Sequence, residues 1–135
     1  MGGVSASVRR MWDDDVASRR LGMELHEASD GVARVSMRVS DEMVNGHGMC
    51  HGGYLFLLAD SAFACACNSG GPVTVAAAAD IVFVASAREG DELVAVATER
   101  TSFGRSGVYD VTITREADAG VVAEFRGRSR TLRPS

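Results

Sequence analysis

A long apolar run is the feature that most limits how this chain can fold. From Gly52 to Asn68 the sequence is rich in Ala and Leu, has no β-branched residue, and carries one charge, on Asp60. That composition predicts a helix, which the Gly and Pro residues of Asn68-Ser-Gly-Gly-Pro72 would end. A helix that is apolar on nearly all sides must be covered on most of them by the rest of the protein.

Segments typical of strands flank this run on both sides. Leu21 to Ala28 and Val32 to Val39 surround Ser29-Asp-Gly31, a pattern that predicts a hairpin. A short polar helix is expected over Val8 to Arg20, and an irregular loop over Ser40 to Cys50. Four further strands are expected after the long helix, over Val73 to Val84, Glu92 to Thr101, Val108 to Arg115 and Val121 to Leu132.

This order of elements predicts an α+β fold. Consecutive strands joined by short turns favour an antiparallel sheet, and one curved sheet wrapped around the apolar helix covers that helix most economically. We expect a single domain over residues 1–135, with residues 1–20 as an N-terminal helical extension. The open surface and edges of such a sheet favour an oligomer.

Composition excludes several classes of function. The net charge of -4 argues against general nucleic-acid binding. The N-terminus lacks the apolar stretch of a signal peptide, and an odd number of cysteines, three, suits the reducing cytoplasm. The apolar run is too short to span a membrane and is interrupted by Asp60. No phosphate-binding loop or dinucleotide fingerprint is present, and no cofactor is expected.

Asp60 is poorly explained by folding alone. An ionised carboxylate in apolar surroundings lowers stability by about 3 kcal/mol unless it is paired. Its pKa is therefore expected to rise, which suits a general base, although an Asp paired inside a core is the alternative. His51-Gly52-Gly53 lies where the helix begins. The free N–H groups of this first turn could polarise a carbonyl oxygen, or the glycines could simply form the turn into the helix.

The spacing of these two groups predicts a dimer. Gly52 and Asp60 are eight residues apart, or roughly 12 Å along a helix. One carbonyl group cannot contact both on one helix. If both act on one substrate, two helices must meet antiparallel and each must supply one group, which places the active sites at the dimer interface.

Other candidates near the helix have alternative structural roles. Asn45 could hold water or a carboxylate, or form a turn with Gly46; His51 could bind substrate or cap the helix. Ser61 could position a water, or bond back to the preceding helical turn. His47, Cys50 and His51 have the residue types of a metal site, but no second cluster completes it, and we expect no metal. A Cys50–His51 nucleophile is less favoured still, because sequence neighbours rarely pair in that way.

The last predicted strand places Arg126, Arg128 and Arg130 on one face by its period of two. These arginines could meet phosphate groups or lie on a solvated outer face. Arg105, in the Gly104-Arg-Ser-Gly107 break, is a similar phosphate-binding candidate.

These motifs together resemble a known family. The segment from Asn45 to Asn68, read with Ser106-Gly-Val-Tyr-Asp-Val111 and Phe125-Arg-Gly-Arg-Ser129, resembles the hotdog-fold acyl-CoA thioesterases, and most closely the PaaI-type enzymes of phenylacetic acid degradation. The likeness extends from Leu21 to Leu132. It implies a hotdog fold, a homotetramer formed from two dimers, and hydrolysis of an aryl-acetyl-CoA such as phenylacetyl-CoA or hydroxyphenylacetyl-CoA.

The resemblance also implies roles for individual residues. Asp60 matches the catalytic carboxylate, and Gly52 matches the residue whose N–H polarises the thioester carbonyl from the other subunit. Asn45, His51 and Ser61 match supporting residues. Substrate contacts are expected from Gly53, Tyr54, Phe56, Arg105, Ser106 and Arg128, although the aromatic side chains of an apolar helix are also typical core residues.

The chain departs from the family pattern after the helix. Relatives often read Ile-Asp-Phe-Leu-Arg-Pro where this chain has Ile81-Val-Phe-Val-Ala-Ser86, and Asp80 stands where an uncharged residue is common. This difference bears on acyl-group preference and CoA contacts. The alternatives are a medium-chain acyl-CoA thioesterase, a non-catalytic acyl-CoA-binding or regulatory protein, and a hydratase or dehydratase, since one fold hosts several chemistries.

Overall fold

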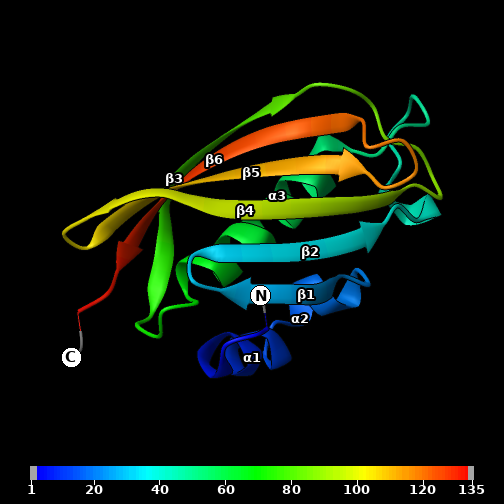
Figure 1. The fold of residues 1–135 in the computed structure, drawn as a ribbon. Helices are drawn as coiled ribbons and strands as arrows, with labels where there is room; N and C mark the ends of the chain where they lie inside the picture. The colour runs from blue at the N-terminus through cyan, green and yellow to red at the C-terminus, as the bar shows by residue number, and fades with distance from the viewer. Residues whose placement is uncertain (1–2, 134–135) are drawn as a thin grey trace.

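The structure, a computed structural model, describes residues 3–133. Six strands form one antiparallel sheet in the order β1-β2-β4-β5-β6-β3, and a long helix, α3 (Gly52–Cys67), lies against one face of it (Figure 1). This is the α+β architecture predicted from the sequence. The strands are β1 (Glu24–Ser29), β2 (Val32–Arg38), β3 (Thr74–Phe83), β4 (Glu92–Phe103), β5 (Ser106–Arg115) and β6 (Val121–Thr131).

The core lies between α3 and the sheet. Leu58 and Phe63 of α3 are fully buried there. The Phe63 ring reaches the sheet because β6 has Gly127 beneath it: a Cβ atom at that position would lie 2.8 Å from the ring. The ring centroids of Tyr109 and Phe125 lie 5.6 and 5.8 Å from that of Phe63, which completes an aromatic cluster over β5 and β6.

Asn68 ends α3 and fixes the start of β3. Its Nδ2 donates to the carbonyl oxygens of Ala64 and Thr74, at 2.8 and 2.9 Å, and its Oδ1 accepts from the Thr74 N–H at 2.9 Å. The predicted helix end is therefore confirmed. The side chain of the capping residue also sets the direction in which the chain enters the edge strand.

The single helix predicted over residues 8–20 is wrong: the structure has α1 (Ala6–Asp13) and α2 (Val16–Arg20). Asp15 separates them, because its side chain accepts from the Ser18 N–H at 2.9 Å and caps the second helix. Val8 and Trp12 bury the inner side of α1.

Strand boundaries differ from the prediction at a few places. β1 begins at Glu24 rather than Leu21, since Gly22 has φ +75° and cannot continue a strand. The Asp30-Gly31 hairpin is confirmed, with φ values of +52° and +78°. A short 3₁₀ turn, η1 (Asp41–Met43), lies within the predicted loop. The break predicted over residues 104–107 is only two residues long in the structure: β4 continues to Phe103, and β5 begins at Ser106.

Two neighbouring regions of the structure are poorly covered. Every residue of the edge strand β3 is exposed except Thr74, which is buried, and Ile81, which is half-buried. On α3, Gly52, Gly53 and Tyr54 of the first turn are incompletely buried, and beyond Leu55 the less covered positions recur at the three- and four-residue spacing of one helix face, at Phe56, Leu57, Asp60, Ala64 and Cys67. Asp60 is therefore central on the least covered face of the helix.

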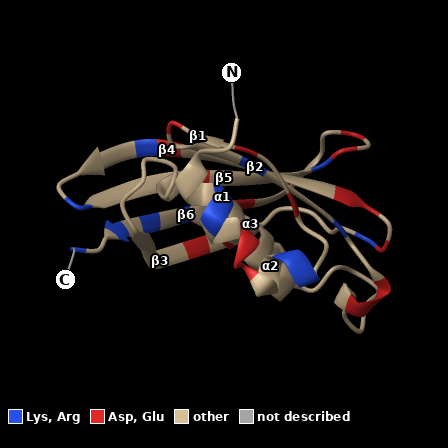
Figure 2. Cartoon of the chain, turned by 90° about the horizontal axis from the view of Figure 1, so that it is seen from below, with Lys and Arg blue, Asp and Glu red and all other residues tan. Residues whose placement is uncertain are grey.

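Charged residues are dispersed rather than gathered on one face. In the view of Figure 2, acidic and basic segments alternate over the strands and the N-terminal helices. None of the helices in residues 3–133 is long and apolar enough to cross a membrane.

Candidate active site

His51 caps the start of α3. Its Nδ1 accepts a hydrogen bond from the Gly53 N–H at 2.9 Å, so the neutral ring carries its hydrogen on Nε2. The capping role considered for His51 in the sequence is thus present. It also occupies the Gly53 N–H, which leaves Gly52 as the candidate donor at this end of the helix.

The Gly52 N–H is in the first turn of α3 and has no acceptor among residues 3–133. A Cβ atom at Gly52 would lie 2.8 Å from the ring of Phe83, so the ring packs directly over this glycine. Both residues line a hollow of about 360 Å³. The hollow is bordered by Asn45, Met49, Cys50, Gly52, Leu55, Phe83, Val84, Ala85 and Ser86.

Asn45 shapes the loop beside this hollow. Its Oδ1 accepts from the backbone N–H groups of His47 and Met49, at 2.9 and 3.2 Å. The turn role considered for Asn45 is therefore present. The residue also lines the hollow, and its amide nitrogen has no acceptor among the described residues, so the Nδ2 group remains able to donate to a ligand.

Asp60 is half-buried, and no hydrogen bond joins its side chain to another described residue. Burial raises the pKa of its carboxyl above the ordinary value, and the negative charge of Asp15 raises it further. The expected rise from burial is thus found, together with a contribution from Asp15 of the N-terminal segment.

Ser61 points to the N-terminal segment. Its hydroxyl lies 2.6 Å from that of Ser18, and both side chains are buried. The Ser18 hydroxyl in turn donates to Asp15 Oδ2 at 2.7 Å. Ser61 therefore does not bond back to its own helix, which was the structural alternative considered for it.

Asp15, Ser18 and Phe83 were not singled out from the sequence. The Asp15-Val-Ala-Ser18 spacing is a helix N-cap pattern, which was available as a local signal. The contact of Ser18 with Ser61, 43 residues away, and that of Phe83 with Gly52 depend on the tertiary fold.

The two aromatic candidates on α3, Tyr54 and Phe56, are each partly buried and partly exposed. Tyr54 is half-buried and meets His51 edge-on, with ring centroids 6.4 Å apart. Phe56 is 36% exposed and packs edge-on against Phe125 at 5.3 Å. Only Phe56 therefore offers a large apolar surface on the open face of the helix.

The phosphate-binding candidates lie away from Gly52 within one chain. Arg105 and Ser106 border a second hollow of about 340 Å³, which also includes Cys67 at the far end of α3. Arg126, Arg128 and Arg130 alternate with buried residues on one exposed face, as the period of two predicted. Arg126 is bound to Asp110 through two hydrogen bonds of 2.6 and 2.9 Å, and this contact lowers the pKa of the Asp110 carboxyl.

Burial makes the three cysteines poorly suited to act as nucleophiles. Burial raises the pKa of Cys50 to about 11, and the pKa values of Cys65 and Cys67 are raised to about 12. A thiol with such a pKa stays protonated near neutral pH and is a poor nucleophile. Among residues 3–133, no group of three or more His, Cys, Asp and Glu side chains is arranged to hold a metal ion.

Comparison with known proteins identifies the family. Residues 47–122 match the family model of the thioesterase superfamily. The acyl-coenzyme A thioesterase PaaI of Escherichia coli is 43% identical over 90% of this chain and 86% of its own length.

Solved structures support the same assignment. The E. coli PaaI protein from the phenylacetic acid degradation operon superposes with a TM-score of 0.92 at 39% identity, covering 98% of this chain and 99% of that one. The smu.793 protein of Streptococcus mutans, solved bound to acetyl-CoA, has a TM-score of 0.77 at 25% identity, with 82% and 88% coverage. The chain therefore belongs to the thioesterase superfamily, as a PaaI-type enzyme with the hotdog fold that hydrolyses thioesters.

Proposed function

We propose that this enzyme hydrolyses aryl-acetyl-CoA thioesters, such as phenylacetyl-CoA or hydroxyphenylacetyl-CoA, to the free acid and CoA. The observation that carries the proposal is that one helix holds two polar groups, the Gly52 N–H and the Asp60 carboxyl, that have no hydrogen-bond partner in the described chain. The Gly52 N–H has no acceptor in the described chain, and the half-buried Asp60 carboxyl has a raised pKa and no hydrogen-bond partner there. A polarised carbonyl and a carboxylate base are what thioester hydrolysis requires.

The Gly52 N–H, assisted by the positive end of the α3 dipole, would polarise the thioester oxygen. Asp60 would then remove a proton from a water that attacks the thioester carbon, and the departing CoA sulfur would recover that proton. Alternatively, an Asp60 oxygen attacks the carbon directly, CoA leaves, and water opens the resulting anhydride. Both routes use the same two groups.

The two groups come from different subunits in this proposal. They lie about 12 Å apart along one helix, too far for one carbonyl. The open face of α3 and the exposed edge strand β3 adjoin and form the surface on which a second copy would pack. Val75, Val82 and Phe83 are 42%, 59% and 54% exposed on that strand, and apolar side chains of this kind favour an interface. A homotetramer of two such dimers is part of the proposal by analogy.

The hollow beside Gly52 is the proposed acyl pocket. Leu55, Phe83 and Val84 give it an apolar lining, which suits an aromatic acyl group. Ala85 and Ser86, which stand where relatives often have Arg-Pro, also line it and leave room for the ring. The E. coli relative's placement in a phenylacetic acid degradation operon supports the same acyl class.

Substrate contacts are proposed from Gly53, Tyr54, Phe56, Arg105, Ser106 and Arg128, with the arginines meeting the CoA phosphates. Arg128 is exposed and has no ion-pair partner among the described residues, whereas Arg126 is engaged by Asp110. The structure of the S. mutans relative with acetyl-CoA supports acyl-CoA as the ligand class. The free thiols of Cys50, Cys65 and Cys67 suit a reducing compartment, and we propose the cytoplasm.

An acyl-CoA panel with detection of the released thiol tests the function. Phenylacetyl-CoA and hydroxyphenylacetyl-CoA should have kcat/KM values at least about tenfold above those of straight-chain acyl-CoAs, a difference of about 1.4 kcal/mol. Asp60→Ala should abolish turnover. Equal rates on straight-chain substrates would overturn the acyl assignment, and tight binding without turnover would favour a non-catalytic role.

A further inference from the structure

Phe56 is held as an exposed aromatic ring on the open face of α3. Within α3, all of which the structure describes, it is the only exposed residue after Gly53. The ring packs edge-on against Phe125, with centroids 5.3 Å apart, and Phe125 is only 3% exposed. The core therefore fixes one side of the Phe56 ring, while its other side is uncovered in a single chain. Fixed aromatic rings of this kind often anchor protein interfaces.

The position of Phe56 along α3 is equally informative. It lies four residues after Gly52 and four residues before Asp60, about 6 Å from each along the helix axis. At this spacing all three residues lie on one face of the helix. If Gly52 of each copy lies opposite Asp60 of the other, the two helices run antiparallel and a two-fold axis relates them. That axis passes the helices at the midpoint of the two groups, which is the level of Phe56.

We propose that the two α3 helices of the dimer pack antiparallel with Phe56 on the two-fold axis, where its ring contacts the same ring of the second copy. This inference rests on the proposed function, because the pairing of Gly52 with Asp60 sets the register. The two proposed active sites then lie on either side of the ring pair, about 12 Å apart along the helices. Each Phe56 ring borders both sites, as the substrate contact proposed for it requires.

Charge complementarity favours this register. It places the Asp60 carboxylate of each chain opposite the positive end of the partner's α3, where a negative charge is stabilised. Asp60 is the only charged residue of α3, so the two faces bring no other helix charge into the contact. The two Asp60 carboxylates stay about 12 Å apart along the helices. A two-fold axis at Asp60 itself would instead bring two half-buried carboxylates face to face.

Charge exchange at position 56 tests the axis, because only a residue on the axis faces its own copy. Phe56→Glu and Phe56→Arg each place like charges against each other, so each variant alone should have a dimer Kd at least about tenfold above that of the wild type. Co-expressed with different tags, the two variants should form mixed dimers to about 80% or more, instead of the half expected for random pairing. Native mass spectrometry measures this fraction. Both variants lose the same ring, so the comparison is matched.

Ala64 supplies the control position. It lies on the same face, eight residues beyond Phe56, so its two copies would be about 24 Å apart along the helices. Ala64→Glu and Ala64→Arg should therefore pair at random. Cross-linking covers the case in which the charged variants do not associate. In a Cys67→Ser background, Phe56→Cys should form a disulfide-linked dimer under mild oxidation and Ala64→Cys should not, since Cys50 and Cys65 are buried.

Random pairing of Phe56→Glu with Phe56→Arg overturns the proposal. A Phe56→Cys variant that stays unlinked, or that links no faster than Ala64→Cys, overturns it as well. These readouts need no turnover, so they are separate from the test of function. If the wild type hydrolyses no thioester, the proposed function fails, while preferential pairing at position 56 would still support the axis. If the wild type is active and the pairing is random, the function stands and this register is rejected.

Discussion

Asp60 bears a charge that folding opposes. Because burial and Asp15 raise its pKa in the folded protein, the folded state holds the proton more tightly than the unfolded chain does. The ionised side chain therefore lowers stability. This loss develops as the pH rises from the carboxyl pKa of the unfolded chain to the higher carboxyl pKa of the folded protein. A group retained at such a position is more easily explained by chemistry than by packing.

Replacing Asp60 with Asn should separate these effects. Turnover should fall by at least about 100-fold, because an amide is neither a base nor a nucleophile. At pH 8 the variant should be more stable than the wild type, with Tm higher by about 2 °C or more, and the difference should shrink towards pH 4. Thermal unfolding over that pH range is the measurement, and a variant less stable at pH 8 would contradict it.

Gly52 can be probed with two substitutions that share one steric change. Both Ala and Pro place a Cβ atom 2.8 Å from the Phe83 ring, which is 54% exposed and can move away. Pro is well tolerated at the first position of a helix, and the preceding His51 has φ -61° and ψ 136°, which suit a residue before Pro. The two variants therefore differ chiefly in the backbone N–H.

If the Gly52 N–H polarises the thioester, Gly52→Pro should have a kcat about 100-fold or more below that of Gly52→Ala. Steady-state kinetics on phenylacetyl-CoA measure the ratio, and circular dichroism checks that both variants keep their helix content. Similar kcat values for the two variants would assign the polarising role to another group.

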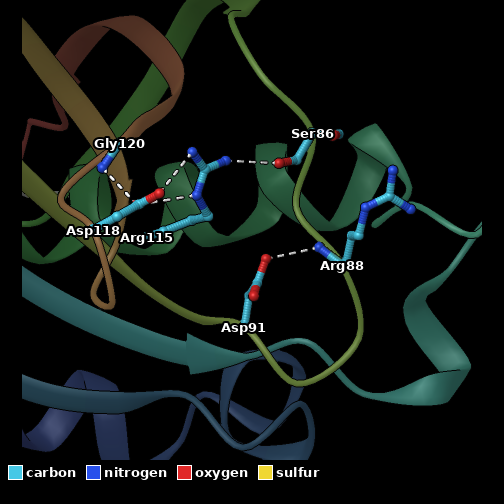
Figure 3. Close-up of polar contacts among 6 residues, drawn as sticks. All are labelled: Ser86, Arg88, Asp91, Arg115, Asp118 and Gly120. Atoms are coloured by element: carbon cyan, nitrogen blue, oxygen red, sulfur yellow. Dashed lines mark hydrogen bonds and ion pairs between the residues drawn. The ribbon is translucent and has the colours of Figure 1, made fainter.

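Among the elements, the segment after β3 is held by the β5–β6 turn. Figure 3 shows Arg115 donating to the Ser86 carbonyl at 2.9 Å and pairing with Asp118, which also accepts from the Gly120 N–H at 2.9 Å. Ser86 lines the hollow beside Gly52. Arg115 therefore braces one wall of the proposed acyl pocket from a strand outside it.

Loss of this brace should weaken substrate binding more than chemistry. We expect Arg115→Ala to raise KM for phenylacetyl-CoA several-fold, roughly three to ten, while kcat stays within about twofold. Arg88→Ala is the matched control, because in Figure 3 the backbone N–H of Arg88, and not its side chain, bonds to Asp91 at 2.9 Å. Equal changes in KM for the two variants would show that the brace does not shape the pocket.

The sequence predicted those elements whose signals are local. Composition and the Asn68 stop defined α3, and Asp30-Gly31 defined the first hairpin. The division of the N-terminal helix was missed because one capping side chain, Asp15, outweighs several residues of helical pattern.

The residues of the candidate site also fall into those that a local sequence signal indicates and those that only the tertiary fold brings together. The sequence singled out Asp60 and Gly52 because a charge in an apolar run and glycines at a helix start are visible in one dimension. The Ser18–Ser61 bond and the packing of Phe83 on Gly52 join distant segments, and no pattern within either segment encodes them.

At the scale of the whole molecule, the proposed site needs two chains. An exposed β3 edge and the open face of α3 leave a single copy with unsatisfied surface, and Asp60 lies in the middle of that face. A monomer in solution at assay concentrations, detected by light scattering, would contradict this assembly. Oligomer size alone does not show that the subunits share a site, so a test of sharing is needed.

Two inactive variants should restore activity when they are combined. A dimer of Asp60→Ala with Gly52→Pro has one site in which both groups are intact and one site in which both are lost. Random exchange makes about half of all dimers mixed, each with one of its two sites active, so the mixture should recover about a quarter of wild-type activity. Co-expression with two different tags gives the mixed dimers for assay. If each site lay within one chain, every site in the mixture would keep one defect and no activity would return, which makes the recovered quarter a direct measure of a shared active site.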